Sequence, residues 1–382
     1  MNERAGKFIR QPGGYKAFIP KPLPPDPSLQ YDDELQSLLS EADRALARLD
    51  GVITVLPNPE LFIAMYVKKE ALLSSQIEGT EASLEGILEF EADLTPKEDI
   101  KQVKEVINYI NALNYGMERL EEIPLTLQLL KEIHKTLIKG TRGSRKTLGE
   151  FRRSQNWIGP AGARLVDATF IPPPPREVAP AMHALEKFFN EYKHIPPLVK
   201  IALIHAQFET IHPFLDGNGR IGRLLITFYL FWKDILSKPV LYLSFYLKKN
   251  RERYYNLLME IRRNGAWEDW IRFFLEGVSE ISREAANTAR DIIMLKQDLI
   301  NELYENNISS IFAVKLIDVL FKTPIIDVKS AREKLKISKV AMNQLFKKFE
   351  RLGIISELTG KERYKKYLFR DYVDIIARGT RE

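Results

Sequence analysis

Thirteen consecutive residues, Ile211 to Arg223, contain the side chains of this sequence best suited to chemistry; they read I-H-P-F-L-D-G-N-G-R-I-G-R. His212 can act as a base, because imidazole titrates closer to neutral pH than other unperturbed side chains do. Asp216 offers the carboxylate oxygens that suit Mg²⁺. Arg220 and Arg223 are three residues apart, so both lie on one face of the helix that the following apolar residues predict.

A turn of small residues, Gly217, Asn218 and Gly219, separates the acidic residue from the first arginine. The backbone N–H groups of such a turn can point together at an anion, and the helix that starts there adds the positive end of its dipole. The two arginines add charge-assisted hydrogen bonds. The stretch therefore predicts a bound nucleoside triphosphate or similar polyphosphate, with a metal ion and a base beside it. The alternative is a helix-capping turn with unrelated charges, which explains the register of these residues poorly.

The stretch resembles the signature of the Fic family, H-x-F-x-D/E-G-N-G-R-x-x-R, and matches it at every specified position. The resemblance implies a mainly α protein, a Fic-fold helical bundle with a β-hairpin flap. It also implies a nucleotidyltransferase that moves AMP from ATP to a Tyr, Thr or Ser hydroxyl of a target protein. UMP or GMP in place of AMP stays open, and so does removal of AMP at the same site.

The resemblance also implies a role for each residue of the stretch. His212 would accept the proton of the target hydroxyl as the oxygen attacks the α-phosphorus. Asp216 would anchor Mg²⁺, and Phe214 would fix the loop as a buried anchor. The residues implied in catalysis are His212, Asn218, Arg220 and Arg223, and those implied in nucleotide binding are Gly217, Asn218, Gly219, Arg220, Ile221, Gly222 and Arg223.

A second informative segment, Ser74 to Thr80, reads S-S-Q-I-E-G-T at the end of a helical pattern. From chemistry alone it is a helix C-terminus, with Gly79 in the left-handed conformation and a solvated Glu78. The segment also resembles the family's inhibitory motif, S/T-x-x-x-E-G/N, with Ser74, Glu78 and Gly79 as the matches. The resemblance implies that Glu78 pairs with Arg223 and occupies the space of a γ-phosphate. It places the protein in the class with an N-terminal inhibitory helix.

Between residues 149 and 171 the helical periodicity is lost, and residues 149–159 and 168–171 read as two short strands around a Gly/Pro turn. They resemble the Fic flap, whose strand edge can hold a target segment by main-chain pairing. Ile158 and Gly159 would then lie near the nucleotide or the target. Ordinary packing beneath the hairpin is the alternative for this segment.

Four other side chains could bear on the site. Tyr254 and Tyr255 resemble the pair that lines the adenine side of the family's pocket, although both could be ordinary core residues. His205 lies on the apolar helix before the signature, and we expect it to be a buried structural histidine. We expect His134 to be a helix-surface or packed residue without a function of its own.

Composition limits the class of protein. The 382 residues are 45% hydrophobic and 28% charged, as in a soluble globular protein of two or three domains. The absence of cysteine excludes disulfides, thiolate catalysis and cysteine-bound metals. The first ten residues lack the apolar core of a signal peptide, and no apolar run approaches about 18 residues. We therefore expect a cytoplasmic protein with no membrane partner, and a homodimer only because the resemblance suggests one.

The C-terminal part is distinct in charge. It contains 16 Lys and Arg against 8 Asp and Glu from residue 321 onward, a net charge of +8, whereas the whole chain carries +6. Helix, turn, helix and basic hairpin resemble a winged helix. Contact with nucleic acid would make the chain a DNA-binding regulator, an alternative of another class; a docking or dimer module, or a merely solvated basic face, also fits. The expected parts are an extended N-terminal arm (1–30), a helical region with the inhibitory motif (31–122), a Fic catalytic core (123–275), a helical connector (276–320) and a winged-helix-like domain (321–382).

Overall fold

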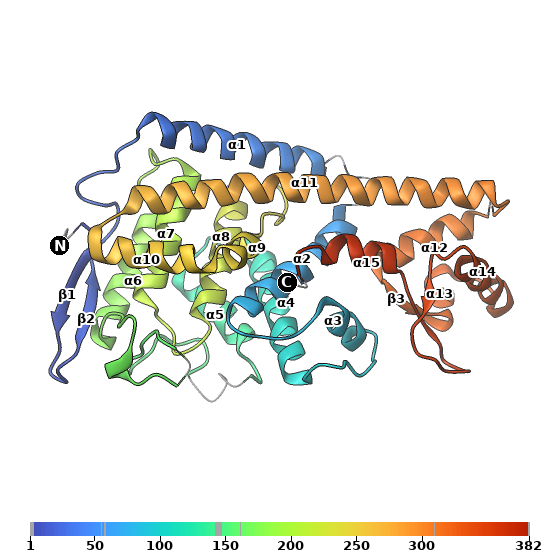
Figure 1. Cartoon of the computed structure of the whole chain (residues 1–382), viewed down its shortest axis with the longest axis horizontal. Coiled ribbons are helices and arrows are strands. Elements are labelled where there is room, and N and C mark those ends of the chain that lie inside the picture. The colour runs from blue at the N-terminus through green and yellow to red at the C-terminus, as the bar shows by residue number, and fades with distance from the viewer. Residues whose placement is uncertain are drawn as a thin grey trace.

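The computed structural model describes residues 4–54, 56, 59–141, 147–160, 162–308 and 310–380, and it is mainly helical, as predicted (Figure 1). The helices are α1 (Asp33–Thr54), α2 (Pro59–Ile77), α3 (Leu84–Glu91), α4 (Ile100–Leu120), α5 (Leu127–Leu137), α6 (Pro175–Asn190), α7 (Pro197–Ile211), α8 (Asn218–Trp232), α9 (Ser244–Lys249), α10 (Arg251–Asn264), α11 (Trp267–Glu305), α12 (Ile311–Lys322), α13 (Val328–Leu335), α14 (Lys339–Arg351) and α15 (Arg370–Ala377). The strands are β1 (Gly6–Arg10), β2 (Lys16–Pro20), β3 (Ile325–Asp327), β4 (Ser356–Glu357) and β5 (Lys366–Leu368), and a short 3₁₀ turn, η2, spans Leu165–Asp167. None of these helices combines the length and the apolar composition that a bilayer crossing requires.

Helix α7 is the centre of the fold, because every side chain from Leu198 to Ile211 is buried. A helix that is apolar on nearly all sides has to be enclosed by other elements, and α6, α8, α10 and α11 pack around this one. Helix α8 is buried almost as completely along its first four turns. The candidate motif therefore joins the two most enclosed helices of the bundle.

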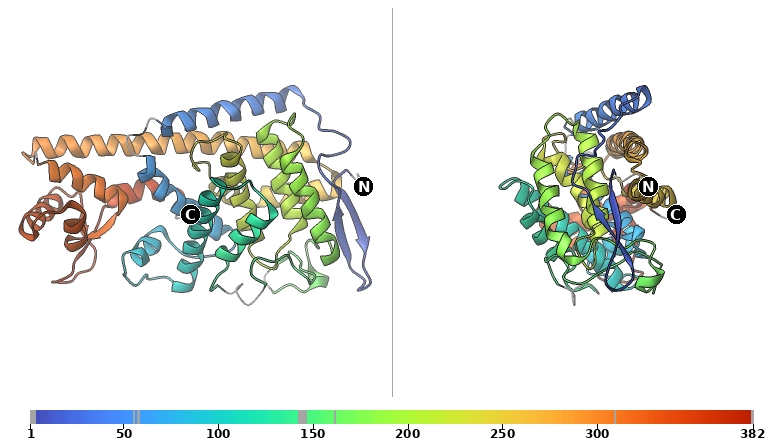
Figure 2. Two further views of the ribbon diagram at one scale, coloured as in Figure 1. Left: turned by 180° about the vertical axis from the view of Figure 1, so that it is seen from behind. Right: turned by 90° about the vertical axis from the view of Figure 1, so that its left-hand side faces the viewer.

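Helix α11 runs along the length of the molecule, with α1 packed beside it (Figures 1 and 2). The buried side chains of α1, including Leu35, Ala42 and Leu49, recur at helical spacing and form the stripe that faces α11. The expected division between residues 275 and 276 falls inside α11.

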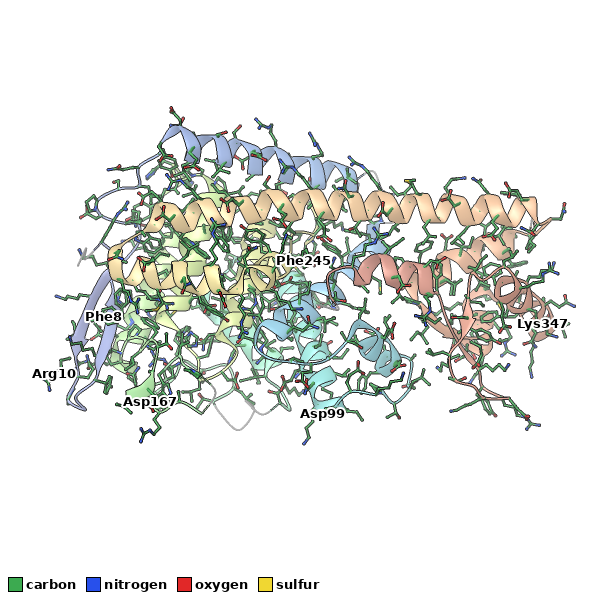
Figure 3. All side chains as sticks on the ribbon, viewed as in Figure 1. Phe8, Arg10, Asp99, Asp167, Phe245 and Lys347 are labelled. Atoms are coloured by element: carbon green, nitrogen blue, oxygen red, sulfur yellow. The ribbon has the colours of Figure 1, made fainter. Side chains whose placement is uncertain are left out.

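The first twenty residues contain a β-hairpin that the sequence analysis did not predict. Strands β1 and β2 pair antiparallel, with Phe8 opposite Phe18; Figure 3 marks Phe8 and Arg10 on it. Phe18 is fully buried and its ring lies 6.0 Å from that of Phe170. Arg4, just before the hairpin, forms an ion pair with Glu268 on α11. The segment is therefore packed on the body as a strand pair.

The flap predicted from residues 149–171 is much less regular than expected. Among the described residues of this segment, a single antiparallel bridge between Ile158 and Phe170 is present, and η2 lies between its two partners. Pro160 and the proline run from Pro172 to Pro175 explain this, because proline has no N–H to donate to a strand ladder.

The C-terminal module, residues 311–380, combines helices α12 to α15 with a small antiparallel sheet in the order β3-β5-β4. Helix, short turn, helix and strand pair occur as the sequence predicted, with a third strand, β3, added before α13. Helix α15 was not predicted. It returns from the sheet to pack on α2 and α11, so that α15 lies beside the helix that Glu78 directly follows (Figure 1).

Candidate active site

The loop between α7 and α8 has an unusual backbone. His212 has a φ of 49° and Gly217 a φ of 78°, both in the left-handed region, which is uncommon for a residue with a Cβ atom. The Asn218 side chain stabilises this shape, because its Oδ1 accepts the Phe214 N–H at 2.8 Å and its Nδ2 donates to the Phe214 carbonyl at 2.9 Å. Asn218, which the resemblance implies in catalysis, thus has both ends of its amide engaged in holding the loop. Phe214 is fully buried, in the position of an anchor.

His134 on α5 supports the same loop and was missed by the sequence analysis as a functional residue. It is packed, as expected, and its ring stacks on Phe214 with centroids 3.8 Å apart. Its Nδ1 accepts the Gly149 N–H at 3.1 Å, so Nε2 carries the proton and donates to the Asp216 carbonyl at 3.0 Å. Burial lowers the pKa of His134 to about 4, which keeps this neutral form at physiological pH.

Arg152 and Asn156, at the start of the flap segment, support the loop from the opposite side. The buried Arg152 donates from Nε to the His212 carbonyl at 2.9 Å, and its backbone N–H donates to the Pro213 carbonyl at 2.9 Å. Asn156 donates from Nδ2 to the Phe214 carbonyl at 2.9 Å. Neither residue was singled out from the sequence, because their partners are main-chain atoms.

The segment at the end of α2 meets the second motif arginine, as the resemblance implied. Arg223 is buried and donates three hydrogen bonds to this segment: Nε to Ser74 Oγ at 2.8 Å, Nη2 to the Ser74 carbonyl at 2.9 Å and Nη2 to Glu78 Oε1 at 2.7 Å. Gly79 follows with a φ of 93°, the left-handed cap that was predicted. A Cβ atom on Gly219 would lie 2.2 Å from Glu78 Oε1, so the glycine leaves room for the carboxylate at the start of α8.

The charges of the site are strongly perturbed. Burial, together with Arg152 and Arg262, lowers the pKa of His212 to about 3. The expectation of a base that titrates near neutral pH is therefore wrong for this state, and the ring is neutral, with a lone pair available. Burial of the Glu78 carboxyl acts to raise its pKa. The charge of Arg223 outweighs this effect, with smaller contributions from Arg220 and His212, so the pKa of Glu78 lies below its usual value. Glu78 is thus an anion at neutral pH.

Asp216 and Arg220 face each other at the start of α8, where Arg220 is buried and Asp216 is partly exposed. The Asp216 carboxylate, with about a third of its side chain exposed, is 3.5 Å from Arg220 Nη2. Within the residues that the structure describes, no three His, Asp or Glu side chains converge as a metal-binding group. A single carboxylate nevertheless suits Mg²⁺, which keeps several waters and takes other ligands from the phosphates of a substrate.

The remaining predicted residues divide into two groups. Ile221 and Gly222 lie on α8 and face the interior, and Tyr254 is a core residue whose hydroxyl donates to His205 Nε2 at 2.9 Å. His205 is buried and structural, as expected. Tyr255 is 38% exposed, and its pKa is raised by packing and by Glu78, so it is the tyrosine of the pair that lies open beside the site. Ile158 is half-buried and Gly159 is exposed.

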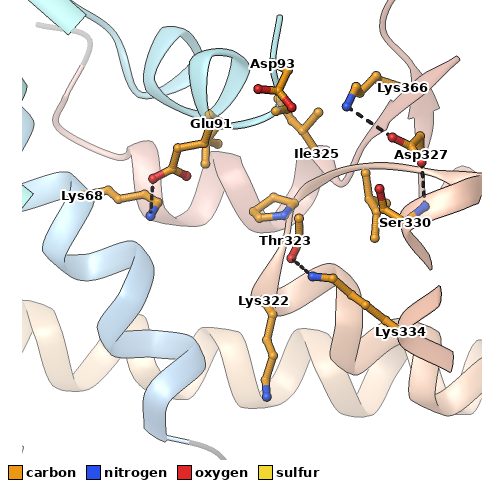
Figure 4. A pocket seen from close by; sticks show the side chains of 14 residues that line it. Lys68, Glu91, Asp93, Lys322, Thr323, Ile325, Asp327, Ser330, Lys334 and Lys366 are labelled. Carbon is orange, nitrogen blue, oxygen red and sulfur yellow. Dashed lines mark hydrogen bonds and ion pairs between the residues drawn. The ribbon is translucent and has the colours of Figure 1, made fainter. Parts of the chain in front are cut away.

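A cavity of about 310 Å³ lies elsewhere, between α2, α3 and the C-terminal module (Figure 4). Two ion pairs cross its lining: Lys68 pairs with Glu91 at 2.9 Å and Lys366 with Asp327 at 3.2 Å. None of its lining residues belongs to the motif loop or to the segment around Glu78. It is a space at the seam between the module and the helical body.

Comparisons with known protein families find two matches. Residues 36–118 match the family model described as Fic/DOC family N-terminal, and residues 124–230 match the model described as Fic/DOC family. The second match contains the loop between α7 and α8, and the first contains Ser74 and Glu78.

Curated relatives carry related names. The chain is 28% identical over 207 residues to a probable protein adenylyltransferase of Aquifex aeolicus, covering 53% of this chain and 57% of that protein. It is 30% identical over 221 residues to the protein adenylyltransferase Fic of Drosophila erecta, covering 55% of this chain and 41% of that protein. The chain thus spans about half the length of these relatives.

Solved structures share the fold. A Fic family protein from Desulfovibrio desulfuricans superposes with a TM-score of 0.59 at 19% identity, covering 89% of this chain and 97% of that one. A Fic domain containing signaling protein from Bacteroides thetaiotaomicron superposes with a TM-score of 0.53 at 20% identity, covering 68% and 97%. At these identities the likeness establishes the architecture alone.

Proposed function

Because this chain carries the N-terminal and Fic domains of the Fic/DOC family, we propose that it is a protein adenylyltransferase, which transfers AMP from ATP to a hydroxyl group of a target protein and of itself. The observation that carries the proposal is the loop between α7 and α8, where a neutral imidazole, a carboxylate and a helix N-terminus meet beside two arginines. Such an arrangement suits a polyphosphate with a base next to it.

In this reaction His212 takes the hydroxyl proton as the oxygen bonds to the α-phosphorus and pyrophosphate leaves. The neutral ring of His212 supports that role, because a protonated imidazole could not accept a proton. Backbone N–H groups from Gly217 to Gly219 stabilise the charge that develops on the phosphate, and Arg220 holds the phosphates. Asp216 would hold Mg²⁺, which supplies neutralisation of charge on the α- and β-phosphates.

Glu78 restrains the enzyme in this proposal. Its carboxylate lies on Arg223 at 2.7 Å and against Gly219 at the start of α8. A γ-phosphate that sought Arg223 would meet a negative charge there, so ATP would bind in a pose unsuited to in-line attack. Movement of the end of α2 would remove the restraint.

Two substitutions test the proposal by mass spectrometry of protein incubated with ATP, Mg²⁺ and cell lysate. We expect Glu78→Gly to increase AMP labelling of targets and of the protein itself, and Glu78→Gly with His212→Ala to abolish that labelling while ATP still binds. Labelling that persists without the imidazole would refute the base assignment. Labelling unchanged by loss of Glu78 would refute the restraint. Incubation of the same proteins with AMP-modified target separates transfer from removal.

A second candidate function, binding of duplex DNA by the C-terminal module, rests on its surface. Six basic side chains on α14 and the β4–β5 loop are exposed and form no ion pair within the described chain; they are Lys339, Lys347, Lys348, Arg351, Lys361 and Arg363. Figure 3 marks Lys347 at this end of the molecule. We expect salt-sensitive DNA binding that Lys347→Glu with Lys348→Glu weakens; no binding at moderate salt would exclude this function.

A further inference from the structure

Glu209 on the last turn of α7 is a buried carboxylate that the mechanism so far does not use. Its side chain is 8% exposed, and its Oε2 lies 3.8 Å from His212 Nδ1. Both His212 Nδ1 and Glu209 Oε1 are buried without a hydrogen-bond partner among the described residues. Such orphaned polar atoms are costly, and here two of them belong to neighbouring side chains that could satisfy each other.

The space around this carboxylate is shaped by α8. Gly222 lies opposite Glu209, and a Cβ atom at Gly222 would lie 2.4 Å from Glu209 Oε1. Any other residue at that position would therefore push the carboxylate aside. Gly222 also accepts a hydrogen bond from His205 Nδ1 at 2.9 Å through its carbonyl, which fixes α8 in this register.

The charges around His212 explain why a carboxylate is useful at this place. Arg152 and Arg262 both lower the pKa of His212, so a proton that arrives on the ring is disfavoured. Glu209 lies on the Nδ1 side of the ring and Glu78 is the other nearby acid. Burial raises the pKa of Glu209 to about 7, with Glu78 acting in the same direction and Arg223 and Arg262 acting against it.

We propose that Glu209 is a positioning residue for His212. It accepts the Nδ1–H of the ring, which leaves the Nε2 lone pair for the hydroxyl of the target, and it stabilises the imidazolium that forms. This inference rests on the proposed function. The hydroxyl proton moves to Nε2, the oxygen bonds to the α-phosphorus, the bond to the β-phosphate breaks, and the Nδ1 proton stays on the ring.

The distance of 3.8 Å exceeds that of a hydrogen bond, but contacts between a base and its orienting group commonly tighten in the substrate complex. The Glu209 main-chain carbonyl is the competing acceptor, because it also acts to raise the pKa of His212. A side-chain substitution separates the two, since it leaves the carbonyl in place.

The kinetic test uses full-length protein with Glu78→Gly as the reference, so that the restraint is absent. Adding Glu209→Gln should lower kcat at least about tenfold with little change in KM for ATP. It should also remove an acidic limb near pH 7 from the kcat profile, because Glu209, whose pKa is raised to about 7, accepts the Nδ1–H as a carboxylate only above that pH. Glu209→Asp, which keeps the charge but shortens its reach, should fall between the two. Glu132→Gln, at an α5 carboxylate that accepts hydrogen bonds from Tyr115 and Gln128, is the matched control. A kcat within twofold of the reference and an unchanged acidic limb would assign the task to the main-chain carbonyl.

A second readout does not depend on activity. The chain contains five histidines, so ¹⁵N-histidine NMR can resolve each ring, with His212→Ala identifying the signal of interest. We expect Glu209→Gln to shift the ring nitrogens of His212 and leave those of His183 unchanged; identical His212 signals would overturn the proposal. If the Glu78→Gly reference transfers no AMP, the proposed function fails, and the NMR result still decides whether Glu209 orients the imidazole.

Discussion

At the scale of single residues, the loop that carries the candidate chemistry depends on an imidazole outside it. His134 stacks on Phe214 and bonds to the Asp216 carbonyl and the Gly149 N–H at once. We expect His134→Ala to destabilise the protein by roughly 2–4 kcal/mol, because it creates a cavity and leaves buried polar groups unpaired. Urea unfolding measures the loss. His183→Ala, on the exposed side of α6, serves as the control and should be neutral; equal effects would mean that the contacts of His134 contribute nothing to stability.

Glu70 on α2 makes stability depend on pH. Burial raises its pKa to about 7, although Ser244 and Tyr109 donate hydrogen bonds to it. A carboxyl whose pKa is higher in the folded than in the unfolded state stabilises the fold at low pH, and this contribution is lost as the pH rises through 7. Between pH 6 and pH 8 we therefore expect the wild type to lose about 1.4 kcal/mol more than Glu70→Gln.

Urea unfolding at several pH values measures this difference. The buried histidines do not obscure it, because the pKa of His134 and that of His205 are lowered to about 4. Their contribution to stability is fully present above about pH 6.5, the usual pKa of histidine, and is lost as the pH falls toward 4. Glu252→Gln, at an exposed position, should leave the pH profile as it is. Parallel profiles for wild type and Glu70→Gln would contradict the assignment.

At the scale of elements, the end of α2 offers two adjacent buried serines with opposite surroundings. Ser74 Oγ accepts the Arg223 Nε–H at 2.8 Å, whereas Ser75 Oγ has no hydrogen-bond partner among the described residues. We expect Ser74→Ala to cost about 1–3 kcal/mol, because it leaves part of a buried guanidinium unpaired. Ser75→Ala should be neutral or slightly stabilising. Denaturant midpoints compare the two, and similar losses would show that Arg223 does not depend on Ser74.

How much of this arrangement can be predicted depends on which atoms make the contacts. The meeting of Glu78 with Arg223 could be predicted, because both belong to short motifs in which side chains bond to side chains. The supports from His134 and Arg152 could not, since each bonds to a main-chain carbonyl of the loop. Every residue has a carbonyl, so such contacts leave no trace in residue types.

The fold shows the same limit. Helices with a clear apolar stripe, such as α1 and α4, lie within the region 31–122 that was predicted to be helical. The continuity of α11 was not predicted, because periodicity alone does not show where one helix ends and the next begins. Nothing in the sequence pattern indicated a role for Gly277 inside this helix. In the structure Gly277 lies against the ring of Tyr246, which a Cβ atom would approach to 2.6 Å. Packing thus requires a glycine inside a helix, where propensity alone would favour another residue.

At the scale of the whole molecule, the C-terminal module shares its core with the helical body. Buried side chains from Ala5 to Ala377 form one continuous cluster. Gln76, two residues before Glu78, donates to the Thr380 carbonyl at 3.4 Å. Arg370 on α15 lies 3.7 Å from Glu85 on α3. The winged-helix-like domain expected from residue 321 onward is therefore attached along α2, α3 and α11, and we expect the molecule to unfold in one cooperative transition.

A substitution within the module tests this cooperativity. Tyr372 on α15 is fully buried, with its ring 4.7 Å from that of Phe321. All four tryptophans lie outside the module, at positions 157, 232, 267 and 270, so tryptophan fluorescence reports only on the helical body. We expect Tyr372→Ala, which removes a buried ring at a cost of roughly 3 kcal/mol or more, to lower the urea midpoint seen by fluorescence. Tyr364→Ala, at a side chain 90% exposed in the same module, should leave that midpoint where it is. A midpoint unaffected by Tyr372→Ala would mean that the module unfolds on its own.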